Sequence, residues 1–480
     1  MDERFEDHLS HPRGRGRAVE GGSDGAAGGA ACGDLVRITL RVEGDRVAEA
    51  GFEASGCGAA IATASAVVEL VDGAPVLDAA RIGPSEVAEE LGGLSPGKLH
   101  AADLAADAMH VALGKAVAAA PSRPADGPAP EAPSAVPGRV LVAMSGGVDS
   151  AVAALLTARS GAETVAVTLE LWRDPENDGE RSCCSASAVR LARGVAHRLG
   201  LPHLTLDLRD EFRAGVVEPY LADHAAGVTP NPCIRCNGNV RLDAMLDLAD
   251  RLGARALATG HYARIGEDGL LRPAADEAKD QTYMLAGLRP ESLARLRFPL
   301  GDVRKPEVRA LAAEAGIEVA NRPDSQDLCF LAGTGRARFL ARHGGIADRP
   351  GPILDAAGAT VGEHRGAHHF TVGQRKGLGV GGGTHEPLYV IATDPRANTV
   401  TVGTREELAT TTVRLKAIRL HRGPEAVAGV KLRYRSRAVP CRLVGSGVEL
   451  GEPFDGAAPG QTAVFLNRDG AVVGTATIAA

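Results

Sequence analysis

The sequence predicts a protein of the α/β class, with a doubly wound α/β domain in its middle, an α+β segment before it and small β modules after it. Short apolar runs alternate with Ala- and Leu-rich helical stretches between residues 139 and 340, which is the pattern of a parallel sheet covered by helices. Beyond residue 340 the runs are shorter and are separated by Gly and Asp, as in small β folds. Six prolines between residues 121 and 137, with no apolar periodicity, indicate a semi-rigid linker.

The N-terminal part is expected to form a domain over residues 1–118. Residues 1–30 are polar and rich in Gly, so we expect them to be poorly ordered and flexible. Residues 35–55 alternate apolar and polar side chains around a turn at 43–45, which predicts a β-hairpin or meander. Residues 57–118 carry apolar side chains at helical spacing.

The rest of the chain is expected to follow a linker over residues 119–138. We predict a doubly wound domain over residues 139–340, a small β domain over 341–405 and a C-terminal β-barrel over 406–480. In the doubly wound domain the predicted strands are residues 140–144, 164–171, 204–208 and 254–258, and the helices between them include residues 187–199 and 241–252.

Composition limits the partners and the compartment. The net charge is −7 and the pI about 6.1, so no overall basic field attracts nucleic acid and any RNA site is a local patch. No apolar run is long enough to span a membrane, and the charged N-terminus lacks the apolar segment of a signal peptide, so we expect a cytoplasmic protein with no membrane partner. Eight cysteines in a reducing compartment then favour metal ligands, redox groups or nucleophiles over structural disulfides.

The first chemical motif is Ser-Gly-Gly-Val-Asp-Ser at residues 145–150, between an apolar run and an Ala/Leu-rich helical run. A strand, a tight Gly loop and a helix N-terminus present unpaired backbone N–H groups, which suit a phosphate. The Walker A pattern is absent, so an ordinary P-loop NTPase is excluded. The motif instead resembles the pyrophosphate-binding (PP) loop of ATP pyrophosphatases, which cleave ATP between the α- and β-phosphates. The alternative is a Gly-rich turn without function in any doubly wound domain.

Three cysteines form the second motif. Cys233 and Cys236 make a C-x-x-C loop that is stiffened by prolines and followed by a helix, a position that stabilises a thiolate. Cys329 lies 93 residues after Cys236 (329 − 236), so only the fold brings them together. By itself the C-x-x-C admits half of a zinc site, a redox pair or part of an iron–sulfur site; zinc is disfavoured because two further close ligands are missing. Loop packing is favoured for Cys183 and Cys184, and a core position for Cys441.

With these motifs in view, residues 139–480 resemble bacterial tRNA-specific 2-thiouridylases along nearly their whole length. The resemblance rests on Ser-Gly-Gly-Val-Asp-Ser (145–150), Cys-Cys-Ser (183–185), Thr-Pro-Asn-Pro-Cys (229–233) with Cys-Asn (236–237), Ala-Thr-Gly-His-Tyr (258–262), Lys-Asp-Gln (279–281), Ser-Gln-Asp-Leu-Cys-Phe (325–330), Thr-Val-Gly-Gln-Arg-Lys-Gly-Leu-Gly (371–379) and Leu-Arg-Tyr (432–434). Such ordered matches imply a PP-loop domain of the adenine nucleotide α-hydrolase type.

The resemblance implies thiolation of the wobble uridine, U34, in tRNAs for Lys, Glu and Gln. ATP, with Mg²⁺ on its phosphates, adenylates the uridine C2 oxygen and pyrophosphate leaves; a sulfur nucleophile then displaces AMP. In the family the position of Cys329 carries the persulfide, and the position of Cys236 is the catalytic thiol that forms a disulfide with it as sulfur is released. A persulfide is a good nucleophile at neutral pH, so the implied roles are chemically consistent.

The resemblance also implies two sets of ligand contacts. The ATP-binding residues are Ala143, Met144, Ser145, Gly146, Gly147, Val148, Asp149, Ser150, Leu169 and Gly260. The residues that contact the target base or the tRNA are Asn231, Pro232, Cys233, Lys279, Asp280, Gln281, Arg433 and Tyr434. By charge alone, the clusters at 279–281 and 433–435 would be interpreted as solvated surface.

One position departs from part of the family, because some members have Asp where this chain has Cys233. Cys233, Cys236 and Cys329 together are able to hold a [4Fe–4S] cluster whose fourth iron binds and delivers sulfide. The persulfide route and the cluster route use the same residues in different roles, and the sequence leaves both open with a slight preference for the cluster.

Residues 10–115 resemble the U-type iron–sulfur scaffold proteins of the NifU/IscU kind. Cys32, Asp34, Cys57 and His100 match cluster ligands of that family, but Ala101 stands where a third cysteine is expected. The segment therefore either keeps a Zn²⁺ or [2Fe–2S] site or is a docking module that has lost its cluster. Its fusion to a segment that resembles a thiouridylase indicates local delivery of sulfur or of a cluster. The expected partners are tRNA and a cysteine desulfurase or another sulfur donor. The motifs that carry this resemblance are Ala-Cys-Gly-Asp (31–34), Gly-Cys-Gly-Ala-Ala-Ile-Ala (56–62) and Lys-Leu-His-Ala-Ala-Asp-Leu-Ala (98–105).

Two other functions are alternatives to tRNA thiolation. Another adenylating ATP pyrophosphatase, such as an amidotransferase-linked synthetase, needs a glutaminase or an ammonia source, and the sequence contains no sign of either. A non-enzymatic iron–sulfur or sulfur carrier with a non-thiolating adenylating domain is the second alternative, and the intact 145–150 loop argues against it.

Overall fold

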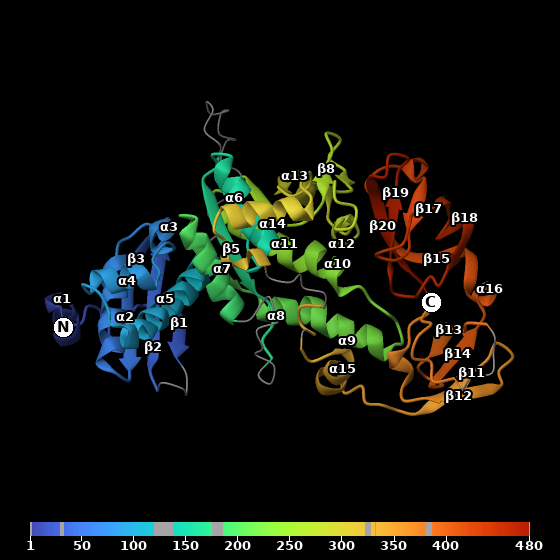
Figure 1. The fold of residues 1–480 in the computed structure, drawn as a ribbon, viewed down its shortest axis with the longest axis horizontal. Coiled ribbons are helices and arrows are strands. Elements are labelled where there is room, and N and C mark those ends of the chain that lie inside the picture. The colour runs from blue at the N-terminus through green and yellow to red at the C-terminus, as the bar shows by residue number, and fades with distance from the viewer. Residues whose placement is uncertain are drawn as a thin grey trace. The chain divides into compact units, whose positions relative to one another are not determined.

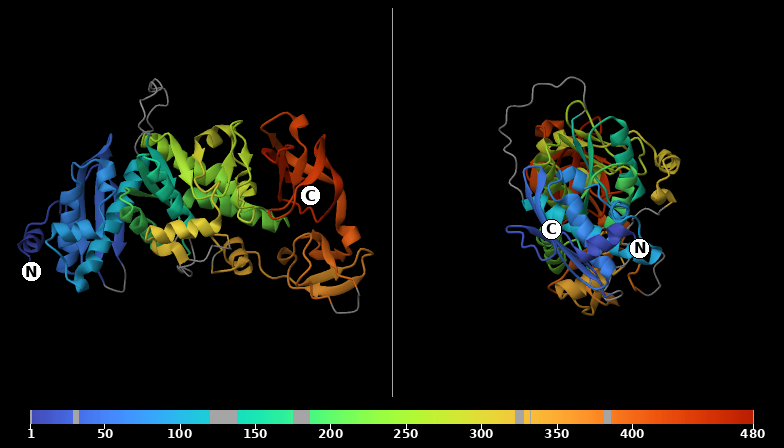
Figure 2. Two further views of the ribbon diagram at one scale, coloured as in Figure 1. Left: turned by 45° about the horizontal axis from the view of Figure 1, so that its top comes forward. Right: turned by 90° about the vertical axis from the view of Figure 1, so that its left-hand side faces the viewer.

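The computed structural model describes residues 2–28, 33–119, 138–174, 186–321, 328–331, 333–380 and 386–479 (Figures 1 and 2). Cys32, Cys183, Cys184 and nearly all of the predicted linker lie outside these residues. The chain divides into two compact units. The first comprises residues 1–209, 244–261 and 295–325, and the second comprises residues 210–243, 262–294 and 326–480.

The first unit begins with an antiparallel three-stranded sheet of order β1-β2-β3. Strands β2 (Leu35–Glu43) and β3 (Arg46–Ser55) form the predicted hairpin, and the alternate side chains Val36, Ile38 and Leu40 are fully buried. Helices pack on this sheet because they bury the apolar faces that the spacing predicted (blue in Figure 1). These helices are α2 (Gly58–Val71), α3 (Val76–Ala79), α4 (Pro84–Glu90) and α5 (Leu99–Ala119), with a short turn η1 at Pro96–Lys98.

The expectation of poor order in residues 1–30 needs correction, because two elements form there. Helix α1 spans Glu3–Ser10 and strand β1 spans Ser23–Gly28. The Asp2 side chain caps α1 by accepting a hydrogen bond of 2.9 Å from the Arg4 amide. The physical reason for the ordered segment is a set of contacts with residues more than fifty positions away, which no local pattern reveals.

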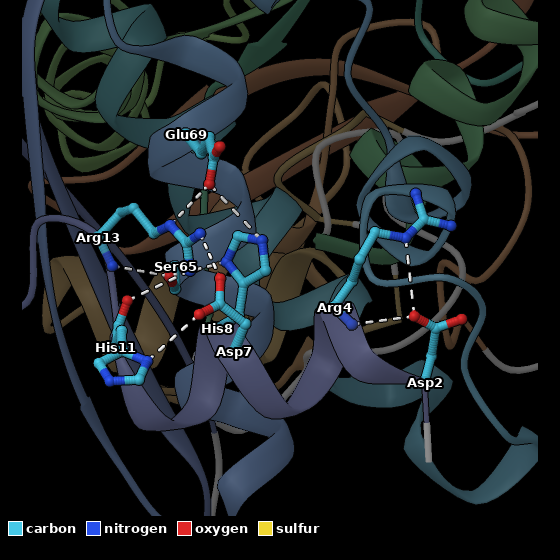
Figure 3. Close-up of polar contacts among 8 residues, drawn as sticks. All are labelled: Asp2, Arg4, Asp7, His8, His11, Arg13, Ser65 and Glu69. Atoms are coloured by element: carbon cyan, nitrogen blue, oxygen red, sulfur yellow. Dashed lines mark hydrogen bonds and ion pairs between the residues drawn. The ribbon is translucent and has the colours of Figure 1, made fainter.

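Ser65 on α2 provides the main polar anchor of α1, as Figure 3 shows. Its hydroxyl is fully buried and lies 2.9 Å from Nδ1 of the buried His8, while it accepts a hydrogen bond of 2.8 Å from the Arg13 amide. Glu69, one turn further along α2, pairs with the Arg13 guanidinium at 2.9 Å. One buried hydroxyl therefore fixes both the end of α1 and the chain that follows it.

We predict that Ser65→Ala detaches α1 without unfolding the rest of the unit. The substitution leaves buried polar groups of His8 and Arg13 without partners, at about 1–3 kcal/mol for each. Hydrogen exchange of the amides in residues 3–13 should become at least tenfold faster, whereas Ser160→Ala, at the end of a different helix, should leave it unchanged. Equal exchange rates in the Ser65 variant and the native protein would contradict this anchor.

The doubly wound domain contributes a five-stranded parallel sheet of order β10-β7-β4-β5-β6 to the first unit. Four strands agree with the prediction: β4 (Val140–Ala143), β5 (Thr164–Glu170), β6 (His203–Asp207) and β7 (Ala256–Thr259). Strand β10 (Leu296–Arg297) is too short to be recognised from sequence. The helices of the domain include α6 (Val148–Arg159), α7 (Ala186–Arg198), α11 (Leu242–Arg251) and α14 (Lys305–Glu314).

Helix α5 of the N-terminal segment packs against β6 and α7 within this same unit. A Cβ atom on Gly114 would lie 1.8 Å from the Thr205 carbonyl oxygen, so only glycine allows this approach. Asp107 of α5 pairs with Arg193 and also with Arg190, the latter at 2.8 Å. Burial holds the pKa of His110 well below its usual value, so this histidine is neutral in the packed state.

The second unit holds the two β modules. A mixed four-stranded sheet of order β12-β11-β14-β13 is followed by a closed six-stranded barrel of order β15-β18-β17-β16-β19-β20 (orange and red in Figure 1). The sheet strands are β11 (Gly351–Leu354), β12 (Thr360–His364), β13 (Tyr389–Asp394) and β14 (Thr399–Gly403). The barrel strands are β15 (Ala409–Leu420), β16 (Gly429–Lys431), β17 (Val439–Val444), β18 (Gly447–Asp455), β19 (Thr462–Leu466) and β20 (Val472–Ile478). The predicted barrel is thus confirmed.

Shorter elements complete the chain. They are α8 (Arg209–Phe212), the π-helix η2 (Arg213–Val217), α9 (Glu218–Ala225), α10 (Pro232–Cys236), the π-helix η3 (Asn237–Arg241), β8 (Arg264–Ile265), β9 (Leu271–Arg272), α12 (Thr282–Leu285), α13 (Pro290–Arg295), η4 (Glu318–Asn321), α15 (Arg336–Gly344), η5 (Ala367–His369), α16 (Arg405–Leu408) and η6 (Pro424–Ala426). Among the described helices, none combines the length and the apolar character that a membrane span requires.

Candidate functional site

The loop that follows β4 has the geometry of an anion cradle. Strand β4 ends at Ala143, Gly146 takes a left-handed φ of +73°, and Gly147 is the N-cap of α6. The Ser150 hydroxyl donates to the Gly147 carbonyl at 2.9 Å and accepts from the Ser145 amide at 3.1 Å. These bonds fold residues 145–150 at the N-terminus of α6, where the backbone N–H groups of the first helical turn and the helix dipole favour phosphate.

Gly260 closes the other side of this cradle. It follows β7, which pairs with β4 in the sheet, and a Cβ atom on it would lie 2.7 Å from the Ser150 amide nitrogen. Leu169, near the end of β5, stands on the opposite neighbour of β4 and is buried. The predicted ATP-binding residues 143–150, 169 and 260 therefore gather at the carboxyl ends of three adjacent strands, where ligands bind in open α/β sheets.

Sequence reasoning missed Lys305, which adds a positive charge to this loop. Its Nζ atom lies 2.7 and 2.8 Å from the two carboxylate oxygens of Asp149, and its side chain is only 10 % exposed. At the start of α14 the Glu307 side chain accepts a hydrogen bond of 2.8 Å from the Arg304 amide, and a proline stands in the first turn, as is typical of a helix start. The pairing of Lys305 with Asp149 was not readable, because 156 residues separate the partners.

We predict that Gly260→Ala weakens ATP binding about ten- to hundredfold. The new methyl group forces the backbone of Ser150 to move, and overpacking of this kind costs about 1–3 kcal/mol, which corresponds to that range in Kd. Calorimetric titration with ATP measures the effect. Gly194→Ala, on a helix of the same unit with open space at its Cβ position, is the control and should bind ATP normally. An unchanged Kd in the Gly260 variant would show that this close approach does not shape the loop.

In the second unit, Asn231 organises the C-x-x-C helix. Its side chain is the N-cap of α10 and accepts hydrogen bonds from the amides of Cys233 at 3.2 Å and Ile234 at 3.4 Å. Cys233 is half-buried in the first turn of α10, and Cys236 is 7 % exposed at its end. The π-helix η3 follows Cys236 directly, a type of irregularity that is frequent at functional sites.

The residue that follows Cys329 packs on the same helical segment as a residue that follows the C-x-x-C motif. Phe330, next to Cys329, packs on Phe212 and Tyr220, with ring centroids 5.9 and 5.1 Å apart. Between those two residues, a Cβ atom on Gly215 would lie 2.7 Å from Val240, which stands one turn after Cys236. The segment formed by α8, η2 and α9 thus packs against Phe330, next to Cys329, and against Val240, one turn after Cys236.

The ligand atoms of Cys233, Cys236 and Cys329 do not all lie within 4.8 Å of one another in this structure. Among the described residues, two groups of side chains bring three ligand atoms within 4.8 Å of one another, and neither group contains Cys233, Cys236 or Cys329. A four-iron cluster holds its cysteines further apart than one ion does, so this distance limit does not test it.

The predicted tRNA residues make local contacts within the second unit. The Gln281 side chain accepts a hydrogen bond of 2.9 Å from the Tyr262 amide, and Asp280 accepts one of 2.7 Å from the Thr282 hydroxyl. The Arg433 guanidinium donates to the carbonyls of residues 455 and 456 at 3.0 and 2.9 Å. These side chains shape their own loops, a role that charge alone does not reveal.

The N-terminal segment brings three of its four predicted ligands together. Asp34 is 4 % exposed and accepts hydrogen bonds from the Cys57 amide at 2.7 Å and the Cys57 thiol at 3.3 Å. His100 Nε2 lies 3.2 Å from Asp34 Oδ2, the same oxygen that accepts from the Cys57 thiol. The hydrogen bond from the Cys57 amide is the main reason that the pKa of Asp34 lies below its usual value. Ala101 is fully buried, and its methyl side chain has no donor atom to replace the missing cysteine.

This donor set fits a small metal centre. One thiol, one imidazole and one carboxylate lie within 4.8 Å of one another, and mixed sulfur, nitrogen and oxygen ligands of this kind are ordinary for Zn²⁺. Cys32, the fourth predicted ligand, lies outside the described residues.

Known proteins match the chain along its length. The family described as the NifU-like N terminal domain matches residues 2–119, and that described as the tRNA methyl transferase HUP domain matches residues 138–333. The tRNA methyl transferase PRC-barrel domain and the aminomethyltransferase beta-barrel domain match residues 337–404 and 406–478. A bifunctional protein NifU/MnmA of Rubrobacter xylanophilus is 46 % identical over 98 % of this chain and 97 % of its own length. The chain belongs to the family of bifunctional NifU/MnmA proteins.

Shorter relatives match the MnmA part. The tRNA-specific 2-thiouridylases MnmA of Salinispora tropica and Zymomonas mobilis are 44 % and 42 % identical over 71 % and 69 % of this chain, and over 99 % and 90 % of their own lengths. The resemblances to the thiouridylases and to NifU are both confirmed, and the doubly wound domain is an ATP-binding PP-loop domain. A carrier with a non-thiolating adenylating domain is not favoured by these relatives.

Proposed function

We propose that this NifU/MnmA protein uses ATP to replace the C2 oxygen of U34 by sulfur in tRNAs for Lys, Glu and Gln. The observation that supports the proposal is that Phe330, next to Cys329, and Val240, one turn after Cys236, pack on one helical segment in a chain that also has an intact PP loop. The pair Cys236 and Cys329 fits a reaction in which one sulfur is passed on and the two cysteines then join. A tRNA substrate supports the expected cytoplasmic location.

The PP loop supplies the activation step. The uridine C2 oxygen attacks the α-phosphorus of ATP, pyrophosphate leaves, and the base is held as its adenylate. The backbone N–H groups at the N-terminus of α6 are suited to bind the phosphates, with Mg²⁺ balancing their charge. Lys305 holds Asp149 in place beside the cradle, so its role in this proposal is to position the loop.

The cysteines supply the second step. The outer sulfur of a persulfide on Cys329 attacks C2 of the adenylated base, and AMP leaves with the former uridine oxygen. The Cys236 thiolate then attacks the inner sulfur of Cys329, so that a Cys236–Cys329 disulfide forms and the sulfur stays on the base. An external thiol must reduce this disulfide before the next turnover, and a cysteine desulfurase or another sulfur donor must reload Cys329. In this proposal Asn231, Pro232, Cys233, Lys279, Asp280, Gln281, Arg433 and Tyr434 line the approach of the tRNA.

The cluster route is the second candidate. Cys233, in the first turn of the capped helix α10, provides a third thiol in addition to those of Cys236 and Cys329. Cys233, Cys236 and Cys329 would hold a [4Fe–4S] cluster, which supplies a binding site for sulfide when present. Iron and sulfide assays after anaerobic purification separate the routes: iron-free protein that thiolates tRNA from a persulfide donor would exclude the cluster.

The N-terminal segment would hold Zn²⁺ or a [2Fe–2S] cluster and support local supply of sulfur. Its ligands would be Cys32, Asp34, Cys57 and His100.

We predict that Cys236→Ser and Cys329→Ser each abolish 2-thiouridine formation while ATP affinity stays within about twofold of the native value. A hydroxyl neither carries transferable sulfur nor forms the disulfide. Mass spectrometry of nucleosides from tRNA incubated with ATP and a persulfide donor measures the product. Cys441→Ser is the control, because burial raises the pKa of the Cys441 thiol to about 11 and keeps it unreactive. Undiminished thiolation by the Cys236 variant would refute the assigned role.

A further inference from the structure

A second group of metal-ligating side chains lies in the small β domain, just before the 371–379 motif. Asp348 precedes β11, and His368 and His369 end the short helix η5. Their ligand atoms lie within 4.8 Å of one another. We propose that Asp348, His368 and His369 form a binding site for a divalent transition-metal ion, with Zn²⁺ as the reference ion.

The geometry of the two imidazoles supports this site. The rings are adjacent, with centroids 4.1 Å apart, and both present Nε2 to the same carboxylate oxygen. Nε2 of His369 lies 2.7 Å from Asp348 Oδ1, and Nε2 of His368 lies 3.7 Å from it. A metal ion with bonds of about 2 Å fits among three such atoms after small side-chain rotations.

His368 provides an independent indication of a ligand. Its side chain is 9 % exposed, and its Nε2 atom is buried without a hydrogen-bond partner. Leaving a buried polar nitrogen unsatisfied costs about 1–3 kcal/mol, and proteins rarely accept that cost without compensation. A metal ion at the centre of the group would satisfy this atom, whereas the ion pair between Asp348 and His369 alone does not.

The backbone holds the site in place. The Arg336 guanidinium donates a hydrogen bond of 2.9 Å to the His369 carbonyl, and the His369 amide donates to the Gly366 carbonyl at 3.1 Å. Arg365 pairs with the second carboxylate oxygen of Asp348 at 2.9 Å, which leaves Oδ1 turned to the histidines. Two imidazoles and one carboxylate are a ligand set of Zn²⁺ and of Fe²⁺, Co²⁺ or Ni²⁺, and they leave a position for water on the exposed side.

The site also has a structural consequence within the second unit. Two residues after His369, the Thr371 hydroxyl lies 3.4 Å from that of Thr229, at the start of the loop that carries Asn231 and the C-x-x-C helix. A metal ion that fixes η5 to the chain before β11 would restrict the segment that follows η5. We therefore assign the site a positioning role, with no part in bond making or breaking.

The test uses the full-length protein, freed of metal with a chelator and dialysed against micromolar Zn²⁺, with bound metal measured by mass spectrometry. Asp348→Asn and His369→Gln, both at partly exposed positions, should each lose one equivalent of zinc. His421→Gln, in the barrel, should bind as much as the native protein. Cys57→Ser removes a thiol of the N-terminal group and should keep the equivalent that His369→Gln loses.

Cobalt and hydrogen exchange supply two further measurements. Co²⁺ bound to Cys57→Ser should show visible d–d bands that weaken in the double variant Cys57→Ser/His369→Gln, and the lost absorption should include no thiolate-to-cobalt charge-transfer band, because the proposed site has no thiolate ligand. Zn²⁺ should slow hydrogen exchange of amides in residues 367–374 at least fivefold in the native protein and not in His369→Gln. Equal metal content in the native protein and both site variants would overturn the proposal, and so would an equal loss in His421→Gln.

Discussion

The close approach of two backbones in the first unit is the constraint on which the ATP site depends. Gly260 leaves β7 at a point where any side chain would collide with the Ser150 amide. Parallel pairing of β7 with β4 sets this approach, and the hydroxyl of Ser150 then holds the Gly loop over the N-terminus of α6. The contact between Gly260 and Ser150 thus depends on the sheet register, the start of α6 and the shape of the loop. Backbone N–H groups of this loop are suited to bind phosphate, so few charged side chains are needed.

In the second unit, the three cysteines of the proposed sulfur transfer lie at half-buried or buried positions. Asn231 caps a helix that places Cys233 in its first turn and Cys236 at a buried position before a π-helix. Packing of Phe330 on Phe212 and Tyr220 ties Cys329 to the helical segment next to that motif. Cys441 shows the contrast, since burial in the barrel raises the pKa of its thiol and leaves it inert.

Local sequence patterns predict most of the strands. The strands of the doubly wound sheet could be predicted because runs such as residues 140–143 are buried on both faces, and the barrel because its strands alternate. Helix α1, the Lys305–Asp149 pair and the group at Asp348, His368 and His369 could not, because each joins residues that are distant in sequence. Asn231 was predicted to face the base, but its capping of α10 depends on a helix start that only the fold displays.

We propose that the PP loop and the cysteines act on the same uridine: ATP activates its C2 oxygen, and the cysteines supply the sulfur that replaces it. The most direct measurement uses tRNA carrying ¹⁸O at C2 of U34, incubated with the protein, ATP and a persulfide donor, followed by mass spectrometry of the released AMP. If the uridine oxygen is adenylated, each 2-thiouridine formed is matched by one ¹⁸O-labelled AMP. Formation of 2-thiouridine together with unlabelled AMP would contradict the account.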